Sequence, residues 1–185
     1  MSDADKLRDA NPWHPMTRPI DLKHLGKLSE ELGEASTAVC SCIDLGMMTI
    51  DPVSGKANWQ ALQDELADVD ANIGLVNSHF DLCVFRHSSQ RLFIDERARL
   101  LSFGASLGIA TAAVSRCIIQ GINECEPVTG KLNRDWLREA LTRVSEAIVP
   151  MVMIFDLDDA AMVRRVAKKT SHLRQWHGML SEAAE

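Results

Sequence analysis

The chain has 185 residues, of which 46% are hydrophobic and 25% charged, and these are the proportions of an ordinary folded domain. Disordered and collagen-like chains are therefore excluded. A formal net charge of −6 argues against broad binding to nucleic acid or anionic membranes, but permits a small anion recognised through a metal. Five cysteines without a zinc-binding spacing, and no apolar run near the roughly 18 residues that span a bilayer, indicate a reduced, cytoplasmic protein.

Apolar residues at helical spacing predict two helices in the first part of the chain. One begins at Asp21, taken as its N-cap, and runs to Gly46. A loop over 46–57 leads to a second helix, which Asn58 is expected to cap and which continues to about Ser78. The stretch 83–95 is expected to be a shorter helix or a bent connector.

The second part of the chain repeats this pattern. Apolar spacing predicts a helix from about Leu100 to Ile118 and another that Asn133 caps, with Pro150 kinking or ending it. A last amphipathic helix covers 158–180. No segment alternates convincingly like a strand, so we expect an all-α helical bundle.

The two parts are related by an internal duplication. Placing 32–82 over 107–157 without gaps gives roughly 20 identities in 51 positions. The clearest match is the loop Pro52–Asn58 against Pro127–Asn133. We therefore expect one all-α domain, 1–185, in which two tandem helix-loop-helix repeats, 21–82 and 96–157, form a pseudo-dimer, followed by the C-terminal helix.

Acidic residues border the apolar stripe on both helices of the first repeat. Glu31 and Glu34 flank it on one helix, and Glu65 and Asp68 flank it on the next. Four carboxylates converging at the core margin are unfavourable unless a cation compensates them. Oxygen ligands alone select a hard ion, so Mg²⁺ or Mn²⁺ is the expected cofactor. The alternative is a solvated acidic face in which Lys27 pairs with Glu31.

Two acidic motifs of the first repeat carry a family resemblance. Glu30–Glu34 has two adjacent glutamates and a third three residues later, and Glu65–Asp68 follows on the next helix. Together they resemble the EExxE…ExxD signature of the all-α nucleoside triphosphate pyrophosphatases, the MazG and dimeric dUTPase superfamily. Further segments resemble the phage-type MazZ-like dATP/dGTP pyrophosphohydrolases, so that nearly the whole chain is covered. They are Asn11–Met16, Asp21–Leu28, Arg116–Gly121, Pro127–Asn133 and His172–His177.

This resemblance implies hydrolysis of a purine deoxynucleoside triphosphate to the monophosphate and pyrophosphate, in the cytoplasm of a bacterial host if the chain is phage-encoded. It implies four metal ligands, Glu31, Glu34, Glu65 and Asp68, with Glu30 or one of the two other glutamates of its motif polarising the attacking water. Lys27 either contacts phosphate or neutralises the acids. Asn72, one turn beyond Asp68, contacts the sugar or base or makes an ordinary core-margin hydrogen bond.

The second repeat has lost these acids, since Ser106, Ile109, Ala140 and Arg143 stand at the four aligned positions. It keeps Arg116 and Gln120, which match the family where the first repeat does not. We therefore expect one composite site, with ligands from the first repeat and phosphate or base contacts from these two residues. Trp13 and His14 are candidates to close over a base, against a packing role for the tryptophan.

Three other functions stay open at this stage. The first alternative is a non-catalytic binding or regulatory module, the second is a protein that sequesters nucleotide without turnover, and the third is a pyrimidine (dUTP or dCTP) pyrophosphatase. In each nucleotide-based reading the partner is a small-molecule nucleotide, with no nucleic acid and no membrane. Further association of pseudo-dimers is compatible with the apolar residues on the helix surfaces.

Overall fold

The computed structural model describes residues 13–85 and 95–182, and over these ranges the chain is all-helical, as predicted. No strand is present in the described ranges, and β-pairing is confined to isolated bridges in two loops. The helices are α2 (Pro19–Leu45), α3 (Asn58–Phe80), α4 (Glu96–Gln120), α5 (Asn133–Ile154) and α6 (Asp159–Glu182).

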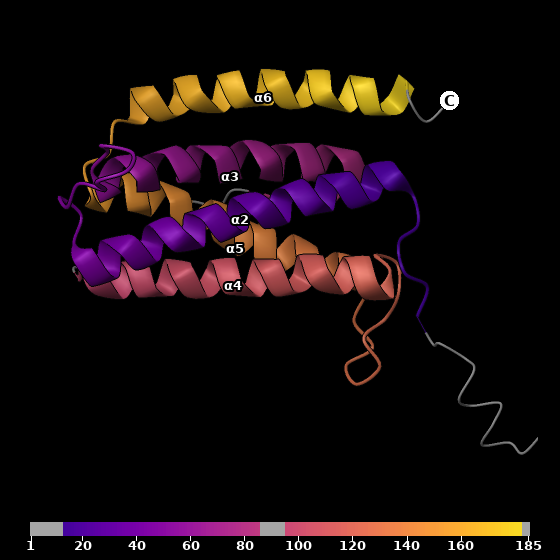
Figure 1. Ribbon diagram of the computed structural model, residues 1–185. Coiled ribbons are helices and arrows are strands. Elements are labelled where there is room, and N and C mark those ends of the chain that lie inside the picture. Colours follow the sequence, from indigo (N-terminus) through magenta and orange to yellow (C-terminus); the bar gives the residue numbers. More distant parts are fainter. Residues whose placement is uncertain (1–12, 86–94, 183–185) are drawn as a thin grey trace, which may run out of the picture.

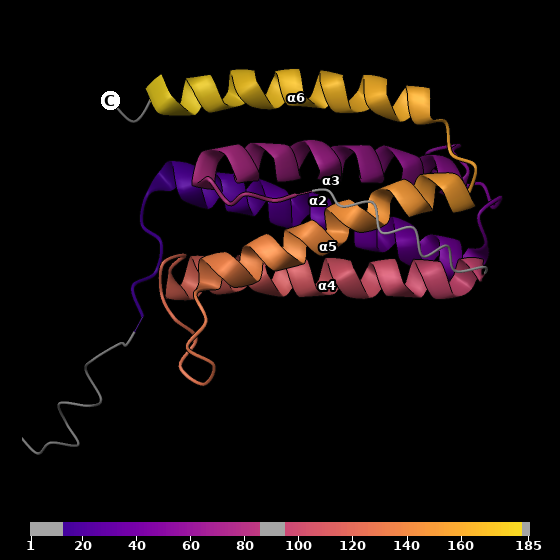
Figure 2. The ribbon, with the colours of Figure 1, turned by 180° about the vertical axis from the view of Figure 1, so that it is seen from behind.

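The helices form a bundle of two hairpins with one added helix (Figure 1). The hairpins α2/α3 and α4/α5 pack on each other chiefly through α2 and α4, and α6 lies along the outer side of α3. The view from behind shows the same layering, with α5 crossing in front of α2 (Figure 2). The predicted apolar stripes supply the core, in which Leu28, Leu66, Leu107 and Leu141 are fully buried.

The helix starts differ from the sequence predictions. α2 begins at Pro19, because proline is preset for the first helical position, and Asp21 lies inside the first turn, where its carboxylate pairs with His79. Asn58 is the first residue of α3 and does not cap it. Its Nδ2 donates to the carbonyls of Ser41 and Gly46 at the end of α2, so this side chain ties the start of α3 to the end of α2.

The two hairpin loops share the same hydrogen bonds at the repeat offset. Asn58 Nδ2 donates to the Gly46 carbonyl at 2.8 Å, and Asn133 Nδ2 donates to the Gly121 carbonyl at 2.8 Å. Lys56 pairs with Asp64 on the following helix, as its counterpart in the second loop does with Glu139. The duplicated sequence thus builds two loops of one kind, while the pseudo-twofold relation between the whole hairpins stays a prediction.

The residues before α2 lie against the second loop. Met16 N donates to the Ile118 carbonyl, and His14 Nδ1 lies 2.9 Å from Glu124 Oε1. Gly121 has a φ of 97°, and a Cβ there would lie 2.2 Å from the His14 carbonyl oxygen. Only glycine fits this position, because it permits both the left-handed backbone and the close approach.

Two further expectations concern α5 and the connector. Pro150 does not end α5, which continues for about one turn to Ile154. Most of the predicted connector lies outside the described residues, and 82–85 form no helix. Among the described helices, α4 has the length and composition that could cross a membrane, and 33% of that apolar window is buried inside the bundle, where α4 packs against α2 and α5.

Candidate metal centre

Carboxylates from α2 and α3 meet on the side of the hairpin that α6 covers. Glu31 is fully buried between Leu28 and Leu32, in the apolar stripe that packs α2 against α3. Asp68 on α3 is also buried. One oxygen each from Glu31, Glu65 and Asp68 lies within 4.8 Å of the others. Three of the four predicted ligands therefore converge.

Three oxygens of this cluster are buried without a hydrogen-bond partner, and because Oε1 of Glu31 still has two ammonium groups within ion-pair distance, Oε2 of Glu31 and Oε2 of Glu65 are the two with no partner of either kind. Burial, reinforced by the charges of Glu34, Asp68 and Glu31, raises the pKa of Glu65 to about 7. A buried anionic oxygen without a donor is costly. The cluster therefore has capacity for a cation at these two atoms.

Three cationic side chains already compensate part of the charge. Oε1 of Glu31 lies 2.8 Å from Lys27 Nζ and 2.9 Å from Lys169 Nζ. Asp68 accepts two hydrogen bonds from Arg165, at 2.8 and 2.9 Å, and one from Lys169 at 3.0 Å. Although burial alone would raise the pKa of Asp68, these donors hold it below its ordinary value.

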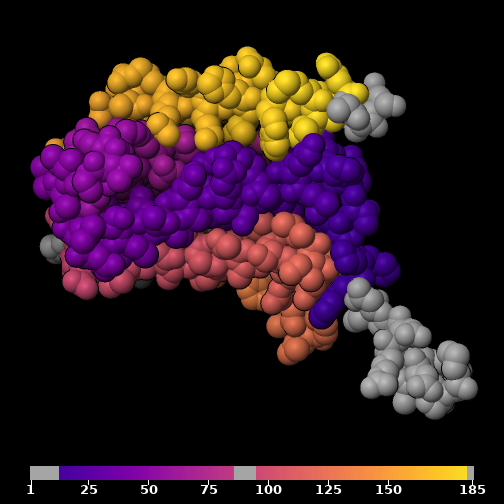
Figure 3. Space-filling model, in the orientation of Figure 1, coloured from indigo at the N-terminus to yellow at the C-terminus, as the bar shows by residue number. Residues whose placement is uncertain are grey.

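The two ammonium groups are held firmly in their charged form. Burial alone would lower the pKa of Lys27 and of Lys169, but their contacts with Glu31 raise both above the ordinary value. Arg165 also contacts Asp64, at 3.1 Å. The site is thus a network in which α6 brings a guanidinium and an ammonium onto acids from two other helices, and Figure 3 shows α6, in orange and yellow, lying against the indigo and purple part of the chain.

The remaining sequence candidates on α2 and α3 lie around this cluster. Glu34 is exposed; its charge acts on Glu65, but its oxygens are not within the 4.8 Å group. Glu30 is exposed and pairs with Lys27 at 2.9 Å. Asn72 is fully buried, and its Nδ2 donates to the Asp68 carbonyl while its Oδ1 has no partner. That unpaired oxygen leaves one acceptor next to the cluster.

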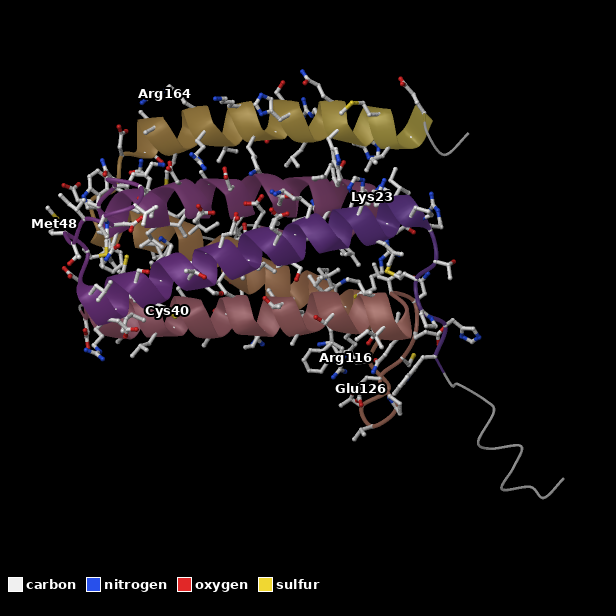
Figure 4. All side chains as sticks on the ribbon, in the orientation of Figure 1. Lys23, Cys40, Met48, Arg116, Glu126 and Arg164 are labelled. Carbon is white, nitrogen blue, oxygen red and sulfur yellow. The ribbon has the colours of Figure 1, made fainter. Side chains whose placement is uncertain are left out.

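The structure does not bring the candidates from the second repeat and the N-terminal segment to these acids. Arg116 lies by the second loop near Glu126 (Figure 4), with its guanidinium 5.8 Å from the Trp136 ring centre. Gln120 is the last residue of α4. Trp13 and His14 belong to the segment that packs on the same end of α4. The expected composite site is therefore not assembled here.

The cations beside the acids come instead from α6, a helix that was predicted but from which no site cation was expected. Arg165 and Lys169 are one turn apart on the side of α6 that faces α3, next to the buried Met162 and Leu173. Their sequence neighbours Arg164 and Lys168 are exposed, and Arg164 points away from the bundle in Figure 4. The helical positions of these four residues relative to the apolar stripe of α6 would have predicted that Arg165 and Lys169 face the bundle and that Arg164 and Lys168 face solvent.

The donor set fits a hard divalent ion. All candidate ligand atoms are carboxylate oxygens, which suit Mg²⁺ and Mn²⁺, and no sulfur or imidazole nitrogen belongs to this group. Glu31, Glu65 and Asp68 are the residues that could hold such an ion. No family model, no curated protein and no solved structure matches this chain, so the geometry and the sequence motifs are the basis for inferring a function.

Proposed function

We propose that the chain is a metal-dependent nucleoside triphosphate pyrophosphohydrolase, which cleaves between the α- and β-phosphates and releases a monophosphate and pyrophosphate. One observation carries the proposal. The carboxylates of Glu31, Glu65 and Asp68 converge with partnerless oxygens on the two glutamates, and Lys169 contacts Glu31 and Asp68 while Arg165 contacts Asp68. Acids for a divalent ion and cations for phosphates are the two components that such a reaction requires.

Glu31, Glu65 and Asp68 would hold Mg²⁺ or Mn²⁺, with Glu34 at the exposed edge as a fourth oxygen donor. When bound, the ion neutralises phosphate charge and lowers the pKa of a water molecule. Lys169 contacts the Oε1 oxygen of Glu31 and also Asp68, so an ion bound to these carboxylates would compete with its ammonium for their negative charge. Lys169 and Arg165 would therefore turn from the carboxylates to the phosphate oxygens, for which a guanidinium fork is well suited.

One of the two exposed glutamates, Glu30 or Glu34, would accept the proton of the attacking water, because both reach solvent while Glu31 and Asp68 are buried. A purine deoxynucleotide, dGTP or dATP, is proposed from the sequence motifs alone. Buried Cys42 and Cys117 and three exposed cysteines, all free, suit a reducing compartment, so we place the reaction in the cytoplasm.

The test is pyrophosphate release from a panel of dNTPs with Mg²⁺ or Mn²⁺. We expect turnover of a purine dNTP by the wild type and a loss of at least about 100-fold in Glu65→Gln, since changing a residue that only orients a metal ligand already costs about 10–100-fold. Glu146→Gln on α5 is the matched control and should keep full activity. Absence of release across the whole panel, or an active Glu65→Gln variant, would refute the proposal.

A second candidate function is a non-catalytic binding module, and the ion pairs favour it. Lys27, Lys169 and Arg165 already neutralise much of the carboxylate charge, as in a structural network. This function predicts no stoichiometric binding of Mn²⁺ at any pH. Titration of the metal-free protein with Mn²⁺, followed by electron paramagnetic resonance of the free ion, separates the two candidates without any substrate.

A further inference from the structure

Three histidines that are distant in sequence meet where α2, α3 and α6 pack together, nearer the start of α2 than the carboxylate cluster is. They are His24 near the start of α2, His79 in the last turn of α3, and His177 near the end of α6. One ring nitrogen of each lies within 4.8 Å of the other two. His24 and His79 have ring centres 4.3 Å apart, and His24 and His177 are stacked at 5.0 Å.

The hydrogen bonds within this triad leave it incompletely satisfied. His24 Nε2 lies 2.8 Å from His177 Nδ1, so these two rings share one proton. His79 Nε2 donates to Asp21 Oδ1 at 2.7 Å, which leaves its Nδ1 free of that contact. His24 is fully buried, and its Nδ1 has no partner. An ion at the contact between His24 and His177 would bind the Nε2 of His24, so it is the closeness of the three rings that favours an ion here.

Burial keeps one ring of the triad, His24, in its neutral form. Burial, together with the neighbouring charges of His79 and His177, lowers the pKa of His24 to about 4, although Asp21 opposes this shift. A metal binds the neutral imidazole. A carboxylate that accepts from the far nitrogen of a ligating histidine fixes the orientation of the ring, and Asp21 is placed to do this for His79.

We propose that His24, His79 and His177 form a binding site for a borderline transition-metal ion such as Zn²⁺, with Asp21 orienting His79. Two imidazole nitrogens on one tetrahedral zinc lie roughly 3.3 Å apart. Widening the 2.8 Å contact of His24 and His177 by about half an ångström would thus let an ion replace the shared proton. The ligands come from three helices, so the ion would fasten α6 to α2 and α3.

A cavity leads to this triad. It has a volume of about 590 Å³ between α3 and α6 and is lined by His79 and His177, together with Thr170, Leu173 and Arg174. The cavity supplies an entry path for the ion and space for a fourth ligand, such as water. The site is separate from the carboxylates, because His24 and Glu31 are two turns apart on α2, about 10 Å along the axis.

The test uses the full chain after dialysis against a chelator, titrated with ZnCl₂ by calorimetry and with CoCl₂ by absorption. We expect one ion per chain, a rise in melting temperature on binding, and the visible absorption of tetrahedral cobalt. His79→Gln and His177→Gln should each weaken Zn²⁺ binding at least about 100-fold. Glutamine preserves hydrogen bonding at both positions, and circular dichroism checks that the variants fold.

Two matched controls make the result specific. His172→Gln removes an exposed histidine of the same helix and should bind Zn²⁺ like the wild type. Glu65→Gln should also leave this affinity within about twofold, whatever its effect on nucleotide hydrolysis, because the carboxylates form the other site. The proposal is overturned if no stoichiometric Zn²⁺ binds, if both histidine variants bind normally, or if Glu65→Gln alone abolishes binding.

Discussion

Replacing Glu65 by glutamine should stabilise the metal-free protein at alkaline pH. The folded environment raises the pKa of Glu65 from 4.5 to about 7, so ionising this carboxyl costs more in the folded than in the unfolded chain. Each pKa unit corresponds to about 1.4 kcal/mol. The rise from 4.5 to about 7 would therefore correspond to about 3.5 kcal/mol for a fully buried group. Because the side chain of Glu65 is partly exposed and screened by solvent, we expect an effect of about 2 kcal/mol on the free energy of unfolding.

The sign follows from proton binding. Between pH 4.5 and about 7, the folded chain holds a proton on Glu65 that the unfolded chain has released. The free energy of unfolding therefore falls as pH rises through this window. Glutamine does not titrate, so the advantage of Glu65→Gln over the wild type should grow by about 2 kcal/mol between pH 5 and pH 8.

Urea unfolding followed by circular dichroism, in the presence of EDTA at both pH values, measures this difference. Glu146→Gln should show no such pH dependence. Adding Mn²⁺ at pH 8 should reverse the order, because an ion at 100 times its dissociation constant stabilises the wild type by about 2.7 kcal/mol. An advantage of Glu65→Gln that is equal at pH 5 and pH 8 would refute the reasoning on its buried carboxyl.

The ion pairs and loops give further tests. Lys169→Gln should tighten Mn²⁺ binding several-fold, because an ammonium that competes with the ion is removed. It should also raise KM for the triphosphate about tenfold, since one charge-assisted hydrogen bond to phosphate, worth about 1.5 kcal/mol, is lost. Lys168→Gln changes an exposed neighbour and should have neither effect in the same assays. Asp68→Ala should lower the free energy of unfolding by about 2 kcal/mol, since Lys169 loses one of its two carboxylates; unchanged urea midpoints would contradict this. Gly121→Ala should cost about 1–3 kcal/mol more than Gly46→Ala, because a Cβ there meets the N-terminal segment, and equal losses would show that this contact does not matter.

The sequence determined the helices, the repeated loop and most of the carboxylate cluster. Apolar residues at helical spacing identify the buried face of each helix, and Glu31, Glu65 and Asp68 lie where that spacing puts them. Helix ends were less accurate: Asn58 spans the loop to carbonyls of α2 instead of capping its own helix. A capping residue and a loop-closing residue have the same chemistry, so the sequence alone does not separate them.

Only the tertiary structure decided which cations and histidines complete the two sites. Periodicity describes one helix at a time, whereas the position of α6 depends on packing between residues about a hundred positions apart. That packing puts Arg165 and Lys169 on the acids, where the sequence led us to expect Arg116, and it joins His24, His79 and His177. Ligand spacing within a helix is set by local geometry, but which helix covers a groove is set by the whole core.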